Sequence, residues 1–66
     1  MFKRFSAERI VVRRKRLGKT QAMISMETGI SQVSISAIEK GRKQPRSETL
    51  ARLSFALECP VDSFFE

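Results

Sequence analysis

The sequence predicts a small all-α domain of five helices, and two observations carry that prediction. Apolar residues recur at the three- and four-residue spacing of an α-helix, most clearly at Leu50, Leu53 and Leu57. Residues that start and stop helices follow one another at short intervals, with Thr20 and Gly29 as the first well-marked pair. Sixty-six residues make one domain, near the lower size limit for folding without disulfides, metals or a partner subunit.

Two short helices joined by a tight turn are expected in the middle of the chain. Thr20 can cap the first with its hydroxyl, and Gly29 can end it in the left-handed conformation. Ser31 can then cap the second helix, in which Ile35 and Ile38 share one face. The opposite face carries small or polar side chains, those of Gln32, Val33, Ser36, Ala37 and Lys40.

That outward face is short, nearly uncharged and free of aromatic rings, whereas an ordinary solvated face would carry more charge. It suits close approach to a flat, polar surface such as the major groove of DNA. A glutamine such as Gln32 can pair with the N6 and N7 edge of adenine, and the Ser36 hydroxyl can bond either base type. Val33 and Ala37 can touch a thymine methyl group. The alternative is a helix that lies against a partner protein or is simply exposed.

The chain before this pair is expected to form a basic arm at residues 1–5, followed by the single domain at residues 6–66. Ser6 is a candidate cap for the first helix. Arginines interrupt the apolar stripe of that helix, and an arginine fork suits a carboxylate. We therefore expect an ion pair between Arg14 and Glu39, with two unrelated surface charges as the alternative.

A core helix is expected to follow from about Ser47, and Pro60 breaks it. Its apolar stripe is expected to contain Leu50, Ala51, Leu53, Phe55, Ala56 and Leu57. The last six residues are expected to form one turn or a short fifth helix, of which one apolar side chain can close the core. Because three large apolar groups exceed what a chain end usually buries, we expect a homodimer contact made by Val61, Phe64 and Phe65.

The charge pattern favours an anionic partner. The chain holds 13 Lys and Arg against 7 Asp and Glu, a net charge of +6, and residues 1–19 contain eight basic and one acidic side chain. A short basic loop follows the third helix and holds Arg42, Lys43 and Arg46. These cations would lie near phosphates if that helix enters a groove of DNA, and the alternative is a solvated charged loop.

Several function classes lack the residues they need. Histidine is absent and Cys59 is the single cysteine, so no metal site, no cofactor and no redox role is expected. No acid/base pair, activated nucleophile or phosphate loop is recognisable, so an enzyme is not expected, and no small-molecule ligand is evident. No apolar run approaches the length of a membrane span and no signal-peptide pattern is present, which favours a cytoplasmic protein without a membrane partner.

With these residues in view, the chain resembles the Cro/XRE-like helix-turn-helix domains of phage and bacterial repressors over about residues 8–66. The matching positions are Arg14, Gly18, Thr20, Gln21, Gly29, Ile30, Ser31, Ile35, Ile38, Glu39, Gly41, Pro45, Glu48, Thr49, Leu50, Leu53, Ala56, Leu57, Val61, Asp62, Phe64 and Phe65. The departures are Lys19, where the family usually has an apolar residue, Ser25, where it usually has alanine, and Met26, where it usually has a polar residue.

The resemblance implies a compact lambda-repressor-like fold whose second and third helices form the helix-turn-helix. It also implies that Gln21 bonds a phosphate and that Arg14 lies near the DNA backbone while it pairs with Glu39. Further phosphate contacts are expected from Ser31, Lys40, Arg42, Lys43 and Arg46.

Pattern and resemblance together predict a transcriptional regulator that binds double-stranded DNA sequence-specifically. We expect a repressor that binds a palindromic operator as a homodimer, with the third helix in the major groove, in the cytoplasm of a bacterial or phage-infected cell. One alternative is an antitoxin or other protein-interaction module whose DNA binding is secondary. Another is a cationic peptide of the membrane surface, suggested only by residues 1–19.

Overall fold

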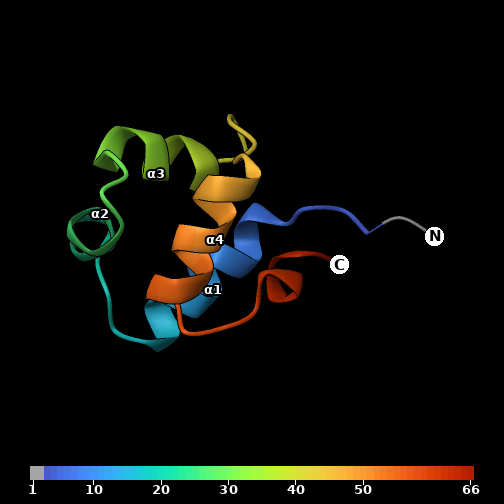
Figure 1. Ribbon diagram of the computed structural model, residues 1–66, viewed down its shortest axis with the longest axis horizontal. Helices are drawn as coiled ribbons and strands as arrows, with labels where there is room; N and C mark the ends of the chain where they lie inside the picture. Colours follow the sequence, from blue (N-terminus) through green and yellow to red (C-terminus); the bar gives the residue numbers. More distant parts are fainter. Residues whose placement is uncertain (1–2) are drawn as a thin grey trace.

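The computed structural model describes residues 3–66, which form four α-helices and one 3-10 turn. The elements are α1 (Ala7–Arg16), α2 (Gln21–Thr28), α3 (Gln32–Glu39), α4 (Ser47–Ala56) and η1 (Val61–Phe64). Figure 1 shows α3 lying across one end of the molecule, with α2 beside it and α4 descending from it toward α1. Within the described residues, no helix is long and apolar enough to cross a lipid bilayer.

The all-α prediction is confirmed, but the expectation of five α-helices is wrong. The last element, η1, is a single 3-10 turn of four residues that begins after Pro60. It stops at Phe65 because that residue has an extended backbone (φ −117°, ψ 145°) and forms an isolated antiparallel β-bridge with Phe5. The chain end is therefore held by backbone pairing and not by a further helical turn.

The residues that begin and end α2 and α3 have the roles that the sequence predicted for them. The Thr20 hydroxyl accepts a hydrogen bond from the backbone N–H three residues later at 3.1 Å, and Ser31 does the same for α3, also at 3.1 Å. Gly29 ends α2 at φ +76°, a left-handed conformation that glycine adopts without steric cost. Ser6 occupies the cap position of α1, but its side chain makes no capping bond.

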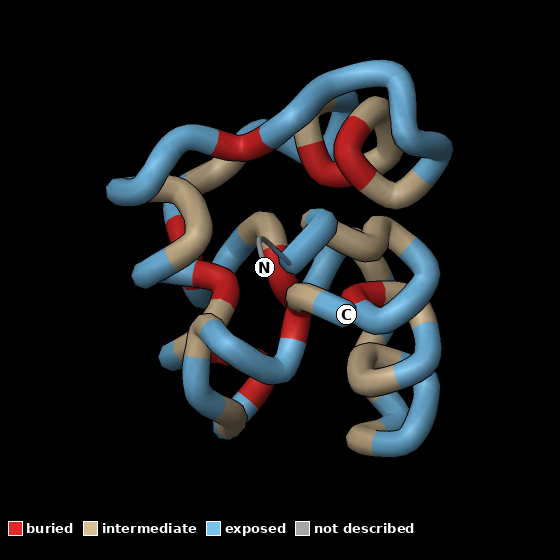
Figure 2. Tube along the Cα trace, turned by 90° about the vertical axis from the view of Figure 1, so that its right-hand side faces the viewer, coloured by how far each residue is buried: buried red, intermediate tan, exposed pale blue. Residues whose placement is uncertain are grey.

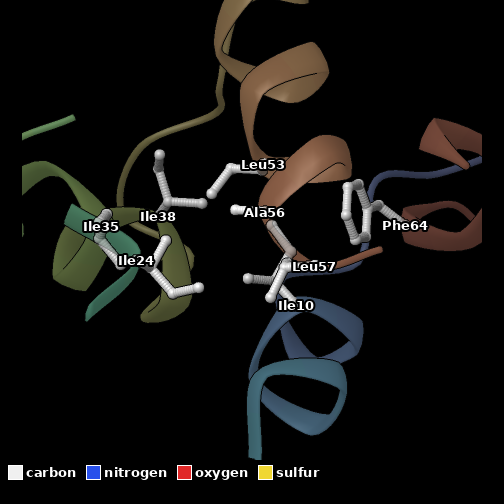
Figure 3. Close-up of a cluster of buried hydrophobic side chains, with 8 residues drawn as sticks. All are labelled: Ile10, Ile24, Ile35, Ile38, Leu53, Ala56, Leu57 and Phe64. Atoms are coloured by element: carbon white, nitrogen blue, oxygen red, sulfur yellow. The ribbon is translucent and has the colours of Figure 1, made fainter. Parts of the chain in front are cut away.

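One hydrophobic core joins all five elements (Figure 3). The buried side chains are Ile10, Ile24, Ile35, Ile38, Leu53, Ala56, Leu57 and Phe64. Figure 2 shows the buried stretches, in red, scattered along the whole trace between exposed ones, as expected when each helix buries one face.

Two residues expected in the core stripe of α4 lie outside it. Phe55 is 84% exposed, and Ala51 is also exposed. Both stand two positions from the buried Leu53, which is about 200° around an α-helix, so both face away from the core. Only residues three or four positions from Leu53 along α4 could share its face.

The two ends of the described chain lie side by side. The Arg4 N–H donates to the Glu66 carbonyl at 3.0 Å, and the Glu66 N–H donates to the Arg4 carbonyl at 2.9 Å. The rings of Phe5 and Phe65 meet edge to face with their centroids 5.8 Å apart. Residues 3–5 of the expected basic arm are thus fixed to the domain, while residues 1 and 2 lie outside the described part.

Candidate nucleic-acid interface

The outer face of α3 brings together the side chains that were expected to read base edges. A shallow hollow of about 260 Å³ lies on this face, lined by Val33, Ser36, Ala37, Lys40 and Arg42. Gln32 is exposed at the start of the same helix, and Val33 is 81% exposed. Ile35 and Ile38 point the other way into the core, so the helix presents small side chains outward and is held by large ones from behind.

The single acidic residue of α3, Glu39, is turned away from that outer face. Its carboxylate accepts two bonds from Arg14, from Nε at 2.7 Å and from Nη2 at 3.0 Å. The side chains of Arg14 and Glu39 are only 12% and 6% exposed, so the expected ion pair is present and largely shielded from water. It ties α1 to α3 and leaves Lys40 as the only charged side chain on the outer face of α3.

The surroundings of this pair favour its charged form. Burial alone would raise the pKa of Glu39, but the hydrogen bonds from Arg14 and Gln21 and the positive charges of Arg14 and Lys15 outweigh burial and lower the pKa. The hydrogen bond to Glu39 raises the pKa of Arg14, against the opposing effect of burial. Both groups are therefore ionised at neutral pH.

The contact between Gln21 and Glu39 did not emerge from the sequence. Gln21 Nε2 donates to Glu39 Oε1 at 2.9 Å, which places the first residue of α2 against the last residue of α3. Arg14 also donates from Nη1 to the Lys19 carbonyl at 2.9 Å. With three donors engaged and 12% of its side chain exposed, Arg14 has little left for a phosphate. Its role as a phosphate contact stays a prediction.

The loop after α3 presents the expected cations to solvent. Gly41 turns the chain at φ +74°, and Arg42, Lys43 and Arg46 are all exposed. Lys43 extends back along α3, with Nζ 3.5 Å from the Ser34 hydroxyl. A hollow of about 380 Å³ separates this loop from the turn between α2 and α3, and its described lining includes three cations and no acid.

Ser31 lies at the edge of this hollow with its hydroxyl already engaged. Its Oγ accepts the backbone N–H of Ser34 at 3.1 Å and lies 3.0 Å from the Ser34 hydroxyl. Ser31 donates its proton to that hydroxyl and is exposed, so one lone pair remains accessible from solvent.

The residues expected at a dimer contact divide into two groups. Phe64 is fully buried (0% exposed) in the core, so its assignment to a subunit interface is wrong. Its ring closes the core between α1 and α4, which the apolar count of the last residues could not distinguish from a surface role. Val61 and Phe65 are half-buried.

Two departures from the family pattern have a physical explanation. Lys19 stands where an apolar residue is usual, and its ammonium reaches the Glu27 carboxylate and the Ala56 carbonyl, each at 2.8 Å. Ser25 stands where alanine is usual, and its hydroxyl donates to the Ile30 carbonyl at 2.6 Å across the turn. Each polar side chain therefore has a hydrogen-bond partner at a position where the family usually has an apolar side chain.

Arg13 has a structural role that the sequence did not reveal. It donates from Nε to the Leu57 carbonyl at 2.8 Å and from Nη2 to the Glu58 carbonyl at 3.0 Å. These are carbonyls that follow the last turn of α4, where intrahelical partners run out. A cation is often found near such carbonyls, but local sequence patterns cannot identify a donor that lies 44 residues away in the chain.

Comparison with known proteins places this geometry in a family. The helix-turn-helix family pattern matches residues 12–64. Repressor protein C2 of Salmonella phage P22 is 44% identical over 55 residues, which cover 83% of this chain and 26% of that protein. The cryptic phage CTXphi transcriptional repressor RstR of Vibrio cholerae is 40% identical over 55 residues, which cover 83% of this chain and 49% of that protein.

The fold has a close counterpart among solved structures. The crystal structure of the P22 c2 repressor protein in complex with synthetic operator 9T superposes with a TM-score of 0.87, at 38% identity and with 96% of each chain covered. The chain spans between about a quarter and about a half of the length of the two curated relatives. With the family pattern extending from α1 to η1 and the fold shared throughout, the chain belongs to the Cro/XRE-type helix-turn-helix family.

Proposed function

We propose that this chain is a transcriptional regulator that binds double-stranded DNA sequence-specifically and acts as a repressor. One observation carries the proposal. The outer face of α3 combines small side chains with exposed cations at its end, while its one carboxylate is held inside by Arg14. A surface of this kind can approach the phosphates of DNA, because the one negative charge of the helix is paired with Arg14 and turned away from the outer face.

Base choice would come from α3 lying in the major groove. Gln32 would bond an adenine edge through its amide, and the Ser36 hydroxyl would bond a neighbouring base. Val33 and Ala37 would contact thymine methyl groups, for which the exposed Val33 side chain is well placed.

Affinity would come from phosphate contacts on both sides of that helix. Gln21 begins α2, whose first backbone N–H groups lack intrahelical partners and can bind a phosphate. Ser31 and Lys40 flank α3 at its two ends. Further cations follow in the adjacent loop, at Arg42, Lys43 and Arg46.

We further propose that the regulator acts as a homodimer on a palindromic operator. A twofold pair of α3 helices would read half-sites about 34–36 Å apart. Because Phe64 is buried, the subunit contact would have to use Val61 or Phe65, or the exposed ring of Phe55. Sedimentation of Phe55→Ser and Phe65→Ser at rising protein concentration would separate these surfaces.

Repression would follow from occupancy of an operator that overlaps a promoter. Both curated relatives carry the word repressor in their names, and the superposed P22 structure holds a synthetic operator. Such a regulator would work in the bacterial cytoplasm, on the nucleoid.

A pair of substitutions tests the division of roles. Gln32→Ala should weaken binding to the cognate site by about 1–3 kcal/mol and relax the preference at one base pair, with little effect on random DNA. Ser63→Ala removes an exposed polar side chain from η1, which packs on α1 and α4 and not on α3, and is its control. Arg42→Ala should weaken every sequence and lower the salt slope by about 0.9, and Arg16→Ala, in the last turn of α1, is its control. Equal effects of Gln32→Ala on cognate and random duplexes would refute the assigned role of α3.

A second candidate function has one observation in its favour. Met26 and Phe55 are 87% and 84% exposed, which is more apolar surface than a DNA contact through α3 requires. An antitoxin or regulatory module would use such side chains to hold a partner protein, with DNA binding as a secondary activity. A stable partner that co-purifies, and is lost in Met26→Ser or Phe55→Ser while DNA binding persists, would favour this role.

A further inference from the structure

A second cationic groove lies on the other side of the loop that follows α3. It has a volume of about 490 Å³, and its lining comes from the start of the described chain and from Gly41, Lys43 and Gln44. Lys3 and Arg4 face Lys43 across it, and Phe5 and Phe65 contribute its apolar part. Among the described residues that line the groove, three carry a positive charge and none carries a negative one.

The nearest acidic side chain at the chain end is engaged elsewhere. Glu66 pairs through its backbone with Arg4, but its carboxylate lies 3.7 Å from Arg9 Nε and lines a different cleft, between α1 and η1. The positive charge of Lys3, Arg4 and Lys43 is therefore not neutralised by an acidic neighbour within the groove. An anion in the groove would be attracted by Lys3 and Arg4 from one side and by Lys43 from the other.

The arm that carries Lys3 and Arg4 is fixed in place. Arg4 exchanges two backbone hydrogen bonds with Glu66, at 3.0 and 2.9 Å, and the Ser6 N–H donates to the Phe64 carbonyl at 2.7 Å. The edge-to-face contact of Phe5 with Phe65 adds apolar contact. Because the backbone is held at Arg4, a ligand bound there costs side-chain entropy but little backbone entropy.

The groove is continuous with the face of α3 through Lys43. That residue lines both this groove and the hollow beside the turn between α2 and α3, and its Nζ is 3.5 Å from Ser34 on α3. A phosphodiester strand that passes Lys43 along the loop would run next into the groove. The positive charges of Lys3, Arg4 and Lys43 would attract the phosphates of such a strand.

We propose that this groove binds a phosphate of the DNA backbone beyond those held by α2, α3 and the loop. Lys3 and Arg4 are then DNA contacts, and Arg4 can offer a phosphate two parallel N–H groups. The proposal rests on the proposed function, because it extends the same interface to the start of the chain. It predicts that the footprint of the protein includes at least one phosphate that α3 and its loop do not protect.

The test uses the full chain with a cognate duplex obtained by selection and with a random duplex. Affinity is measured between 50 and 200 mM salt, concentrations at which each phosphate contact contributes about 0.9 to the salt slope. Arg4→Ala and Lys3→Ala should each lower the slope by about 0.9 on both duplexes, whereas Arg16→Ala should leave it unchanged. Arg4→Lys should restore the slope. In ethylation interference, Arg4→Ala should show one fewer phosphate whose ethylation blocks binding, and melting temperatures should stay equal because the Arg4 backbone bonds remain.

The outcomes separate the two proposals. If the wild-type chain binds neither duplex, the proposed function fails and this inference fails with it. If the wild-type chain binds and Arg42→Ala lowers the slope, but Arg4→Ala and Lys3→Ala behave like Arg16→Ala, the groove is not a phosphate site while the function stands. A slope that falls together with the melting temperature, without a change in the ethylation pattern, would assign the arm a structural role only and overturn the proposal.

Discussion

Removal of the Glu39 carboxylate should strongly destabilise the fold. Glu39→Ala breaks three hydrogen bonds, at 2.7, 3.0 and 2.9 Å, two from Arg14 and one from Gln21. It also leaves the Arg14 guanidinium with 12% of its side chain exposed and one remaining bond, to the Lys19 carbonyl. Removing one partner of a buried pair costs about 3–5 kcal/mol, and the small exposed part of Arg14 favours the lower end, about 3 kcal/mol.

That loss is large against the total stability of so small a domain. A chain of 66 residues is expected to unfold with about 3–10 kcal/mol, and each kcal/mol shifts its melting temperature by about 4–8 °C. Glu39→Ala should therefore lower the melting temperature by about 12–24 °C, or unfold the chain at room temperature. Urea unfolding followed by far-UV circular dichroism measures the change.

A double substitution distinguishes a stranded charge from simple loss of packing. Arg14→Met with Glu39→Leu replaces both charges by apolar groups of similar size, and should recover most of the stability lost in Glu39→Ala. The reasoning is refuted if Glu39→Ala costs less than about 1 kcal/mol, the value of an exposed pair, or if the double variant is no more stable than Glu39→Ala.

Three further predictions follow from the same contacts. The pKa of Glu39 is lowered in the folded chain, so the ionised carboxylate stabilises the fold fully above the unfolded pKa of about 4.3. This stabilisation is lost as the pH falls through the folded pKa. The difference in unfolding free energy between wild type and Glu39→Gln should therefore shrink from pH 7 toward pH 2 in urea titrations. Phe64→Ala should cost about 3–5 kcal/mol by chemical denaturation, whereas Phe55→Ala should stay within about 0.5 kcal/mol; similar losses in both would contradict the observed burial. Gly29→Ala should cost about 1–2 kcal/mol from its φ of +76° alone, because the added Cβ meets Arg52 at an ordinary 3.7 Å, and a neutral result would argue against a left-handed stop there.

The parts of the fold that the sequence predicted are those set by local chemistry. The hydroxyls of Thr20 and Ser31 and the freedom of Gly29 define where helices begin and end, and each acts on neighbours within a few residues. The pair of Arg14 and Glu39 spans 25 residues, yet it could be expected because the chain offered an arginine in an apolar stripe and one acid to receive it.

The parts that the sequence did not predict depend on contacts between distant segments. Phe55 and Phe64 are the same residue type near the same end of the chain, but Phe55 lies on the solvent face of α4, whereas η1 packs on α1 and α4 and buries Phe64. The pairing of Arg4 with Glu66 involves backbone groups, which carry no sequence signal. The base-contacting and phosphate-contacting roles stay predictions, although Val33, Ser36, Ala37, Lys40 and Arg42 line one hollow on α3 and its loop.

The antiparallel bridge of Phe5 and Phe65 brings the two ends of the described chain together, so the chain can be circularly permuted there. Since Glu66 and Arg4 already face each other as neighbouring strands of a hairpin would, a short glycine-containing turn could join residue 66 to residue 3 with little strain. A circularly permuted chain could then be opened within the exposed loop at residues 42–44, with all four α-helices intact.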